Sequence, residues 1–206
     1  APNFYSNFVK GRPIYSLGIN NYNRFINNYK NQNRGVVEHK ILISNNKKDN
    51  VIQLLFENSK PENKFYIYDY FNDNCSTKVA DLLIENFNDE FNNPKINLSK
   101  KSKDSYRSLI YQMIPKNSWG SLGIDICLGS IIDQDINYRQ TFFLPLKFGK
   151  FLDTLELENP QIIESELVFE SPEITKESGL NLTSPMFVLL IISLLIILIT
   201  FRDFQN

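Results

Sequence analysis

The sequence predicts an α+β domain that is followed by one C-terminal transmembrane helix. Two segments, residues 36–43 and 64–71, have the composition and alternation of β-strands, whereas apolar residues recur at helical spacing in several others. No charged side chain lies between Leu180 and Phe201, and roughly 20 apolar residues suffice for a helix to cross a bilayer. Residues 1–170 are numerous enough for one domain with its own core.

The N-terminal region alternates between helical and extended patterns. Residues 3–34 predict one or two short helices, interrupted where glycine and proline occur near Pro13. Residues 36–43 predict a strand, and Asn45 or Asn46 then caps a helix that ends before Pro61. The helical spacing rests on two sets of side chains: Tyr22, Phe25, Ile26 and Tyr29, then Val51, Leu54, Leu55 and Phe56.

Residues 64–71 predict a strand that turns directly into a helix. Three tyrosines alternate with other residues, so Tyr66, Tyr68 and Tyr70 share one face of the strand. The pattern then changes to an apolar stripe at helical spacing. Asp73 or Asn74 is a good N-cap, which places Cys75 in the first turn of the helix. The other strand face holds Phe65, Ile67, Asp69 and Phe71, and the helical stripe holds Val79, Leu82, Leu83 and Phe87.

The rest of the chain predicts three more apolar segments, a strand and the membrane anchor. Residues 105–114 form a helix that ends at Pro115, and residues 119–132 form a third apolar segment. A further helix is expected at residues 142–157 and a strand at 162–169. The final ranges are a linker at 171–184, the transmembrane helix at 185–201 and a tail at 202–206.

Composition excludes one class of partner and leaves the membrane orientation open. The 22 Lys and Arg residues nearly balance the 23 Asp and Glu residues, so no nucleic-acid partner is expected. Lys176 and Arg202 flank the apolar segment and do not decide its orientation by the positive-inside rule. The chain starts at Ala1 rather than at a methionine, so we expect a processed product or a piece of a longer protein.

Cys75 is the residue best placed for covalent chemistry. Unpaired amides and the positive end of the helix dipole favour an anion in the first turn of a helix. The same amides can stabilise an oxyanion, so this position suits acyl transfer through a thiol. The alternative is that Cys75 is simply a small buried residue.

The other cysteine and the only histidine are expected to be structural. Cys127 is flanked by apolar residues at helical spacing and is interpreted as part of the core, although a disulfide with Cys75 is conceivable in an oxidising compartment. His39 alternates with aliphatic residues and is interpreted as an ordinary residue on the polar face of a strand. Two cysteines and this one histidine do not make a usual zinc site, so no metal or other cofactor is expected.

Four blocks together resemble one family, the periplasmic domain of the Lnb-type lipoprotein N-acyltransferases. They are residues 2–11, 61–78, 105–110 and 119–129. The resemblance as a whole extends over nearly the entire soluble part and continues into the membrane span. The most specific motif is Asp-Asn-Cys-Ser-Thr-Lys at residues 73–78.

The resemblance implies a papain-like or permuted NlpC/P60-like cysteine domain, incomplete at its N-terminus, on the periplasmic face of the inner (cytoplasmic) membrane. Cys75 matches the nucleophile of the family. By analogy, its thiolate takes an acyl chain from a phospholipid as a thioester and passes it to the N-terminal amine of a diacylated lipoprotein. The implied partners are thus a phospholipid donor, a lipoprotein acceptor and the membrane.

The chain departs from the family pattern at several points. The histidine of the family lies in a strand upstream of the 2–11 block, so the base is missing here, and its role is not transferred to His39. Lys78 stands where arginine is commoner, which keeps the charge but not the planar fork. Cys127 replaces a small apolar residue, and the later transmembrane helices of the family are absent.

Six polar residues within the family-like region are secondary candidates for substrate binding or support of the thiol. For each, a helix cap or a surface ion pair is the alternative. They are Asn74, Thr77, Asp104, Arg107, Asp125 and Arg139.

Three functions remain open from the sequence. The leading hypothesis is the acyltransferase, for which we expect an apolar groove beside Cys75. The second is a cysteine amidase or peptidase that acts on cell-wall peptides, for which we expect a polar cleft. The third is a non-catalytic, membrane-anchored domain that binds lipid or another envelope protein.

Overall fold

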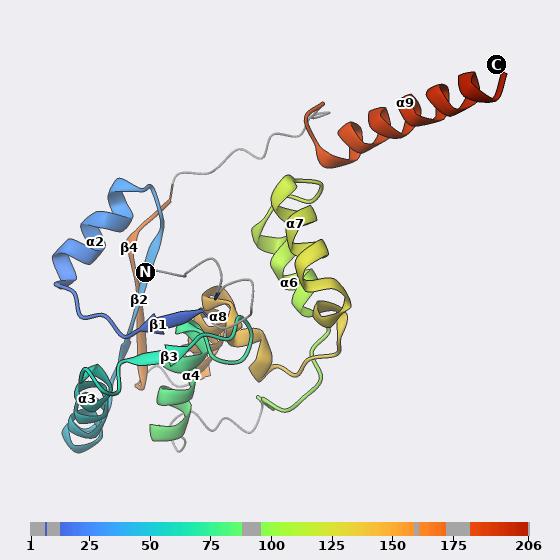
Figure 1. Ribbon diagram of the computed structural model, residues 1–206. Coiled ribbons are helices and arrows are strands. Elements are labelled where there is room, and N and C mark those ends of the chain that lie inside the picture. The colour runs from blue at the N-terminus through green and yellow to red at the C-terminus, as the bar shows by residue number, and fades with distance from the viewer. Residues whose placement is uncertain (1–6, 8–12, 88–95, 159–160, 172–181, 206) are drawn as a thin grey trace. The chain divides into compact units, whose positions relative to one another are not determined.

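The computed structural model describes residues 7, 13–87, 96–158, 161–171 and 182–205 (Figure 1). The chain divides into two compact units. The first unit consists of Ala1–Lys100 and Asn137–Glu173, and the second of Lys101–Ile136 and Ile174–Asn206. The domain predicted at 1–170 draws on both units.

The first unit mixes helices and strands, which confirms the α+β prediction. It contains two antiparallel pairs of strands, β1 with β3 and β2 with β4. Its elements are β1 (Ile14–Ser16), α2 (Tyr22–Asn31), β2 (Val36–Ile41), α3 (Asn45–Ser59), β3 (Phe65–Ile67), α4 (Cys75–Asn86), the 3-10 helix η2 (Arg139–Phe143), α8 (Pro145–Glu158) and β4 (Ile163–Phe169).

An aromatic core holds this unit together. Phe142 of η2 lies between two phenylalanines of α8, with ring centroids 5.3 Å from Phe148 and 5.0 Å from Phe151. Ala80 of α4 and Ile163 of β4 are fully buried in the same cluster. The core therefore joins the helix that begins at Cys75 to segments far along the chain.

The second unit contains α6 (Tyr106–Met113), α7 (Trp119–Leu128), the 3-10 helix η1 (Gly129–Asp133) and α9 (Pro185–Gln205). Serines begin two of these helices, because Ser105 and Ser118 each form a capping box. Gly129 ends α7 with φ of 57°, a conformation that favours glycine.

α9 is the predicted transmembrane helix, and it extends to Gln205 rather than residue 201. Its segment Pro185–Phe204 is long and apolar enough to cross a membrane, and only 6% of its apolar window is buried in the structure. A soluble core helix would be mostly covered. The composition of α9 thus suits a lipid environment.

Most predicted elements are present, with local differences. The region predicted as short helices contains β1 before α2, because Ile14 and Tyr15 pair with Ile67 and Tyr66 of β3. Ser44, not Asn45 or Asn46, is the N-cap of α3. The 2–11 block, apart from residue 7, and residues 172–181 of the predicted linker lie outside the described residues.

One prediction about packing was wrong. Cys127 was expected in the core, but its side chain is exposed on α7. The neighbouring Ile126 is also exposed, so the apolar residues of this helix do not all face the protein interior. Both cysteines are free thiols in the structure.

Candidate functional site

Cys75 is the first residue of α4, and its side chain is exposed. A tight turn delivers the chain to this point. The carboxylate of Asp69 accepts hydrogen bonds from the backbone amides of Phe71 and Asn72 at 2.9 and 2.7 Å, and the backbones of Asp69 and Asp73 form a β-bridge. The strand-to-helix transition predicted from the sequence is therefore built by residues 69–73, and it presents the thiol to solvent.

Asn74 fixes the first turn of α4. Its side-chain oxygen accepts hydrogen bonds from the amides of Ser76 and Thr77 at 2.8 and 2.9 Å, while the backbone amide of Asn74 donates to Thr77 Oγ1 at 2.8 Å. This is a complete capping box, and Asn74 and Thr77 are both buried. These two secondary candidates therefore hold the backbone of the turn that carries Cys75.

Further contacts tie the start of α4 to η2. Asn74 Nδ2 donates to the carbonyl oxygen of Phe143 at 2.9 Å, and Ser76 Oγ donates to that of Phe142 at 2.6 Å. Arg139 donates to the carbonyl oxygen of Thr77 at 3.2 Å and is paired with Asp81. Arg139, another secondary candidate, thus supports the helix that carries the thiol.

A group of tyrosines precedes Cys75 in the chain, and two of them, Tyr66 and Tyr68, interact with it electrostatically. The rings of Tyr15 and Tyr68 stack with centroids 4.3 Å apart, and Tyr68 also contacts Tyr66 and Tyr70. Burial raises the pKa of Tyr68 to about 12, and a negative charge at Cys75 acts in the same direction. Burial is also the larger cause of the raised pKa of Tyr66, and a negative charge at Cys75 is the second cause. Both phenols are therefore protonated at neutral pH and can donate hydrogen bonds but cannot act as bases.

Lys78 contacts the tyrosine group at its edge. Its ammonium group lies 4.3 Å from the centroid of the Tyr66 ring and 2.7 Å from the carboxylate of Asp73. Val79, four residues after Cys75 on the same helix face, is 49% exposed. The surroundings of the thiol thus combine aromatic rings and an aliphatic side chain with one ion pair.

His39 engages a different element. It lies on β2, its Nε2 atom is 2.8 Å from Asp153 Oδ1 of α8, and its side chain is only 13% exposed. It was predicted on the polar face of a strand, and its partner is indeed a carboxylate. This contact with α8 is typical of a histidine that has a structural role.

The remaining candidates form a cluster inside the second unit. Arg107 donates to Asp125, to Asp133 at 2.6 Å and to the carbonyl oxygen of Gly129 at 2.7 Å. Its hydrogen bond lowers the pKa of Asp133, and the hydrogen bond from Tyr111 to Asp125 raises the pKa of that tyrosine. This network links α6 to α7 and η1. Asp104 precedes α6 and accepts a hydrogen bond from Ser108 at 3.3 Å.

The structure thus brings together four of the predicted residues, Cys75, Asn74, Thr77 and Arg139, in the first unit. Asp104, Arg107 and Asp125 belong to the second. The sequence analysis did not include Tyr66 and Tyr68 in the site. Their alternation directly before the Asn-Cys motif was a usable signal, because one strand face leads into the first turn of α4.

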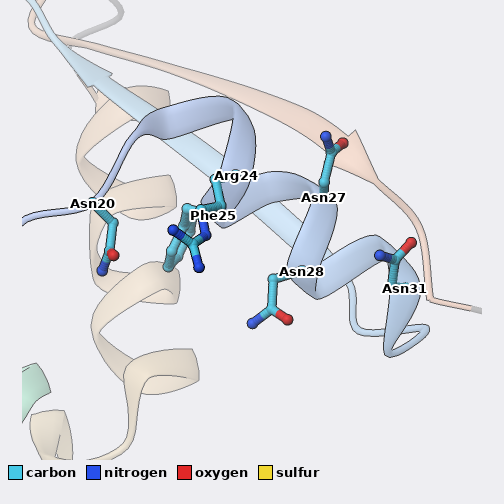
Figure 2. A pocket seen from close by; sticks show the side chains of 6 residues that line it. All are labelled: Asn20, Arg24, Phe25, Asn27, Asn28 and Asn31. Atoms are coloured by element: carbon cyan, nitrogen blue, oxygen red, sulfur yellow. The ribbon is translucent and has the colours of Figure 1, made fainter.

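An open surface depression of about 710 Å³ lies elsewhere, along α2 (Figure 2). Figure 2 shows its lining side chains projecting from α2 and from the turn before it, and none is a predicted site residue. They are Asn20, Arg24, Phe25, Asn27, Asn28 and Asn31. Among the described residues, no group of three or more His, Cys, Asp or Glu side chains is arranged to hold a metal ion.

Comparison with protein families identifies the stretch that contains the site. Residues 1–112 match the family model of the Lnb N-terminal periplasmic domain. The chain belongs to the Lnb N-terminal periplasmic domain family. No curated protein and no solved structure matches it.

Membership in the Lnb family covers Cys75, its capping box and the tyrosine group, whereas η2, α7 and α9 lie beyond residue 112. It relates the chain to lipoprotein biogenesis at a membrane. Together with the apolar α9, it is consistent with a membrane-anchored protein that has a periplasmic domain.

Proposed function

We propose that this protein is a cysteine-dependent lipoprotein N-acyltransferase, anchored in the inner membrane with its folded domain in the periplasm. The observation that carries the proposal is the placement of Cys75. Its exposed thiol starts α4 on a first turn held by the buried Asn74, inside the stretch that matches the Lnb family. A rigid backbone beneath a reactive group is what efficient covalent catalysis requires.

The proposed reaction has two steps. The Cys75 thiolate attacks the carbonyl carbon of a phospholipid ester, a C–S bond forms, and the glycerol oxygen leaves and takes up a proton. The products are a lysophospholipid and an acyl thioester on Cys75. The free amine of a diacylated lipoprotein then attacks the thioester, loses a proton and expels the thiolate, so the acyl chain ends in an amide.

An oxyanion forms on the attacked carbonyl in each step. In the first turn of α4, one backbone amide can donate a hydrogen bond to it. The amides of Ser76 and Thr77 are engaged by Asn74. The amide of Cys75 itself is therefore the first-turn donor in this proposal, and a protonated Tyr66 or Tyr68 supplies the second hydrogen bond. Neither phenol serves as the base, because both are protonated at neutral pH.

The surroundings of Cys75 favour an acyl substrate over a cell-wall peptide. The tyrosine rings and the exposed Val79 present apolar surface, which suits an acyl chain. The contacts of α8 with the helix of Cys75 and with strand β4 of an antiparallel pair support a papain-like core. We include that core, and the single domain 1–170, in the proposal.

The test is an acylation assay on the full-length gene product in membranes. The substrates are a phospholipid with a labelled acyl chain and a synthetic diacylated lipopeptide with a free N-terminal amine. We expect labelled, N-acylated peptide from the wild type and from Cys127→Ser, and none from Cys75→Ser. An N-acetylated peptide should stay unlabelled. Product that persists in folded Cys75→Ser would refute the proposal, whereas cleavage of cell-wall peptides without acylation would favour the peptidase.

A further inference from the structure

The outer face of α7 is strongly apolar. Trp119 and Ile126 lie seven residues apart, and therefore on the same face of the helix, and they are 56% and 73% exposed. Ile131 in η1 is 66% exposed. We define Trp119, Ile126, Cys127 and Ile131 as the α7 face. Large apolar side chains in such a group are costly to leave in water.

The polar side of α7 is neutralised within the protein. Asp125 is the one charged residue of the helix, and it pairs with Arg107 and accepts a hydrogen bond from Tyr111, both on α6. α6 thus holds the only charge of α7. The outer face of the helix therefore carries no charge that would oppose burial of its apolar side chains.

α7 begins beside the start of the membrane helix (Figure 1). Trp119 Nε1 donates to the carbonyl oxygen of Thr183 at 2.9 Å, two residues before α9 begins. The amide of Met186 donates to Asn117 Oδ1 at 3.2 Å. These two hydrogen bonds connect the start of α7 to the start of α9, where α9 would enter a bilayer.

We propose that α7 is an interfacial helix and that the α7 face lies against the lipid surface next to α9. The inference rests on the membrane placement in the proposed function, since α9 must span the bilayer. Tryptophan is enriched at the headgroup level, where Trp119 lies if α9 enters at Pro185. A helix with one apolar face binds the interface by burying that face. This placement accounts for the exposure of Cys127.

The experiment uses Cys127 as the attachment site for a probe. The full-length protein with Cys75→Ser is labelled at Cys127 with an environment-sensitive fluorophore and reconstituted into phosphatidylethanolamine and phosphatidylglycerol vesicles, with and without spin-labelled lipid. The control carries the fluorophore on Gln112→Cys, an exposed position on α6, with both native cysteines changed to serine. We expect blue-shifted emission and lipid quenching at residue 127 that is several-fold stronger than at residue 112.

Two further readouts separate the possible failures. Resistance to alkaline extraction reports on α9 alone. If the protein resists extraction but the probe at residue 127 is quenched no more than that at 112, the interfacial helix is refuted and the membrane anchor stands. If the protein is extracted, the membrane placement itself fails. A probe that is shielded from water but insensitive to spin-labelled lipid would show that protein, a second copy included, covers the α7 face, and would overturn the inference.

Discussion

The side chain of Asn74 donates a 2.9 Å hydrogen bond to the backbone oxygen of Phe143, 69 residues further along the chain. The oxygen of the same side chain accepts from the two amides that follow Cys75. One buried amide group therefore joins the local cap of α4 to the aromatic core around η2. The position of the thiol depends on the whole first unit and not only on its own turn.

Replacing Asn74 should destabilise the fold substantially. Asn74→Ala removes the N-cap and leaves the buried carbonyl of Phe143 without this donor, which together cost roughly 2–4 kcal/mol in the free energy of unfolding. Denaturant titration followed by circular dichroism measures this loss. The matched control is Asn72→Ala, because Asn72 is exposed and its side chain donates to Asp69 within the same turn. Equal stability of the two variants would contradict the role of Asn74.

Ionisation of Tyr68 should report on Cys75. Because the pKa of Tyr68 is raised to about 12 in the folded protein, its contribution to stability is complete below about pH 10. It is lost as the pH rises through 12. Absorbance of phenolate during an alkaline titration, compared with Tyr68→Phe, gives this pKa. Cys75→Ser should lower it while leaving it above 10, since burial is the larger cause. No change in Cys75→Ser would argue that the two side chains do not interact.

Acid should weaken the cluster in the second unit. Hydrogen bonds from Arg107 hold the pKa of Asp133 below its ordinary value of 3.8. The resulting stabilisation is present above pH 3.8 and is lost as the pH falls through the lower, folded-state value. Arg107→Met removes the hydrogen bonds that lower the pKa of Asp133. The difference in stability between wild type and variant should therefore shrink below about pH 4. A difference that stays constant down to pH 2 would rule out this linkage.

His39 should be dispensable for the chemistry. His39→Gln breaks its contact with Asp153, whose side chain is half exposed, and should leave the protein folded. We expect acylation of Cys75 to persist in this variant and in Asp153→Asn. Loss of acylation in both, with the fold intact, would instead assign His39 as the base.

Local patterns in the sequence predicted the elements around the thiol well. The cap at Asn74, the start of α4 and the strand-to-helix change depend on neighbouring residues, and they appear as expected. Tertiary contacts decided the rest. β1 is only three residues long and exists because it pairs with β3, which no periodicity reveals. β3 itself ends at Ile67, since the bridge between Asp69 and Asp73 turns the chain.

The errors at other positions have a common cause. Helical spacing of apolar residues predicted a buried Cys127, but the same spacing arises on a helix that faces an apolar environment outside the protein. Arg139 was a candidate from the sequence, but its partner Asp81 could not be inferred, because the two lie 58 residues apart and meet only in the folded unit. Spacing identifies a face of an element but not what covers it.

Thioester trapping on Cys75 tests the central claim most directly. The full-length protein in its membrane is incubated with a phospholipid that carries a labelled acyl chain, without lipoprotein acceptor, and the labelled peptide is mapped by mass spectrometry. The account predicts hydroxylamine-sensitive label on Cys75 that is absent in Cys75→Ser and moves to a diacylated lipopeptide when one is added. A folded, membrane-inserted wild-type protein that takes up no label, or takes it up on Cys127, would contradict the account.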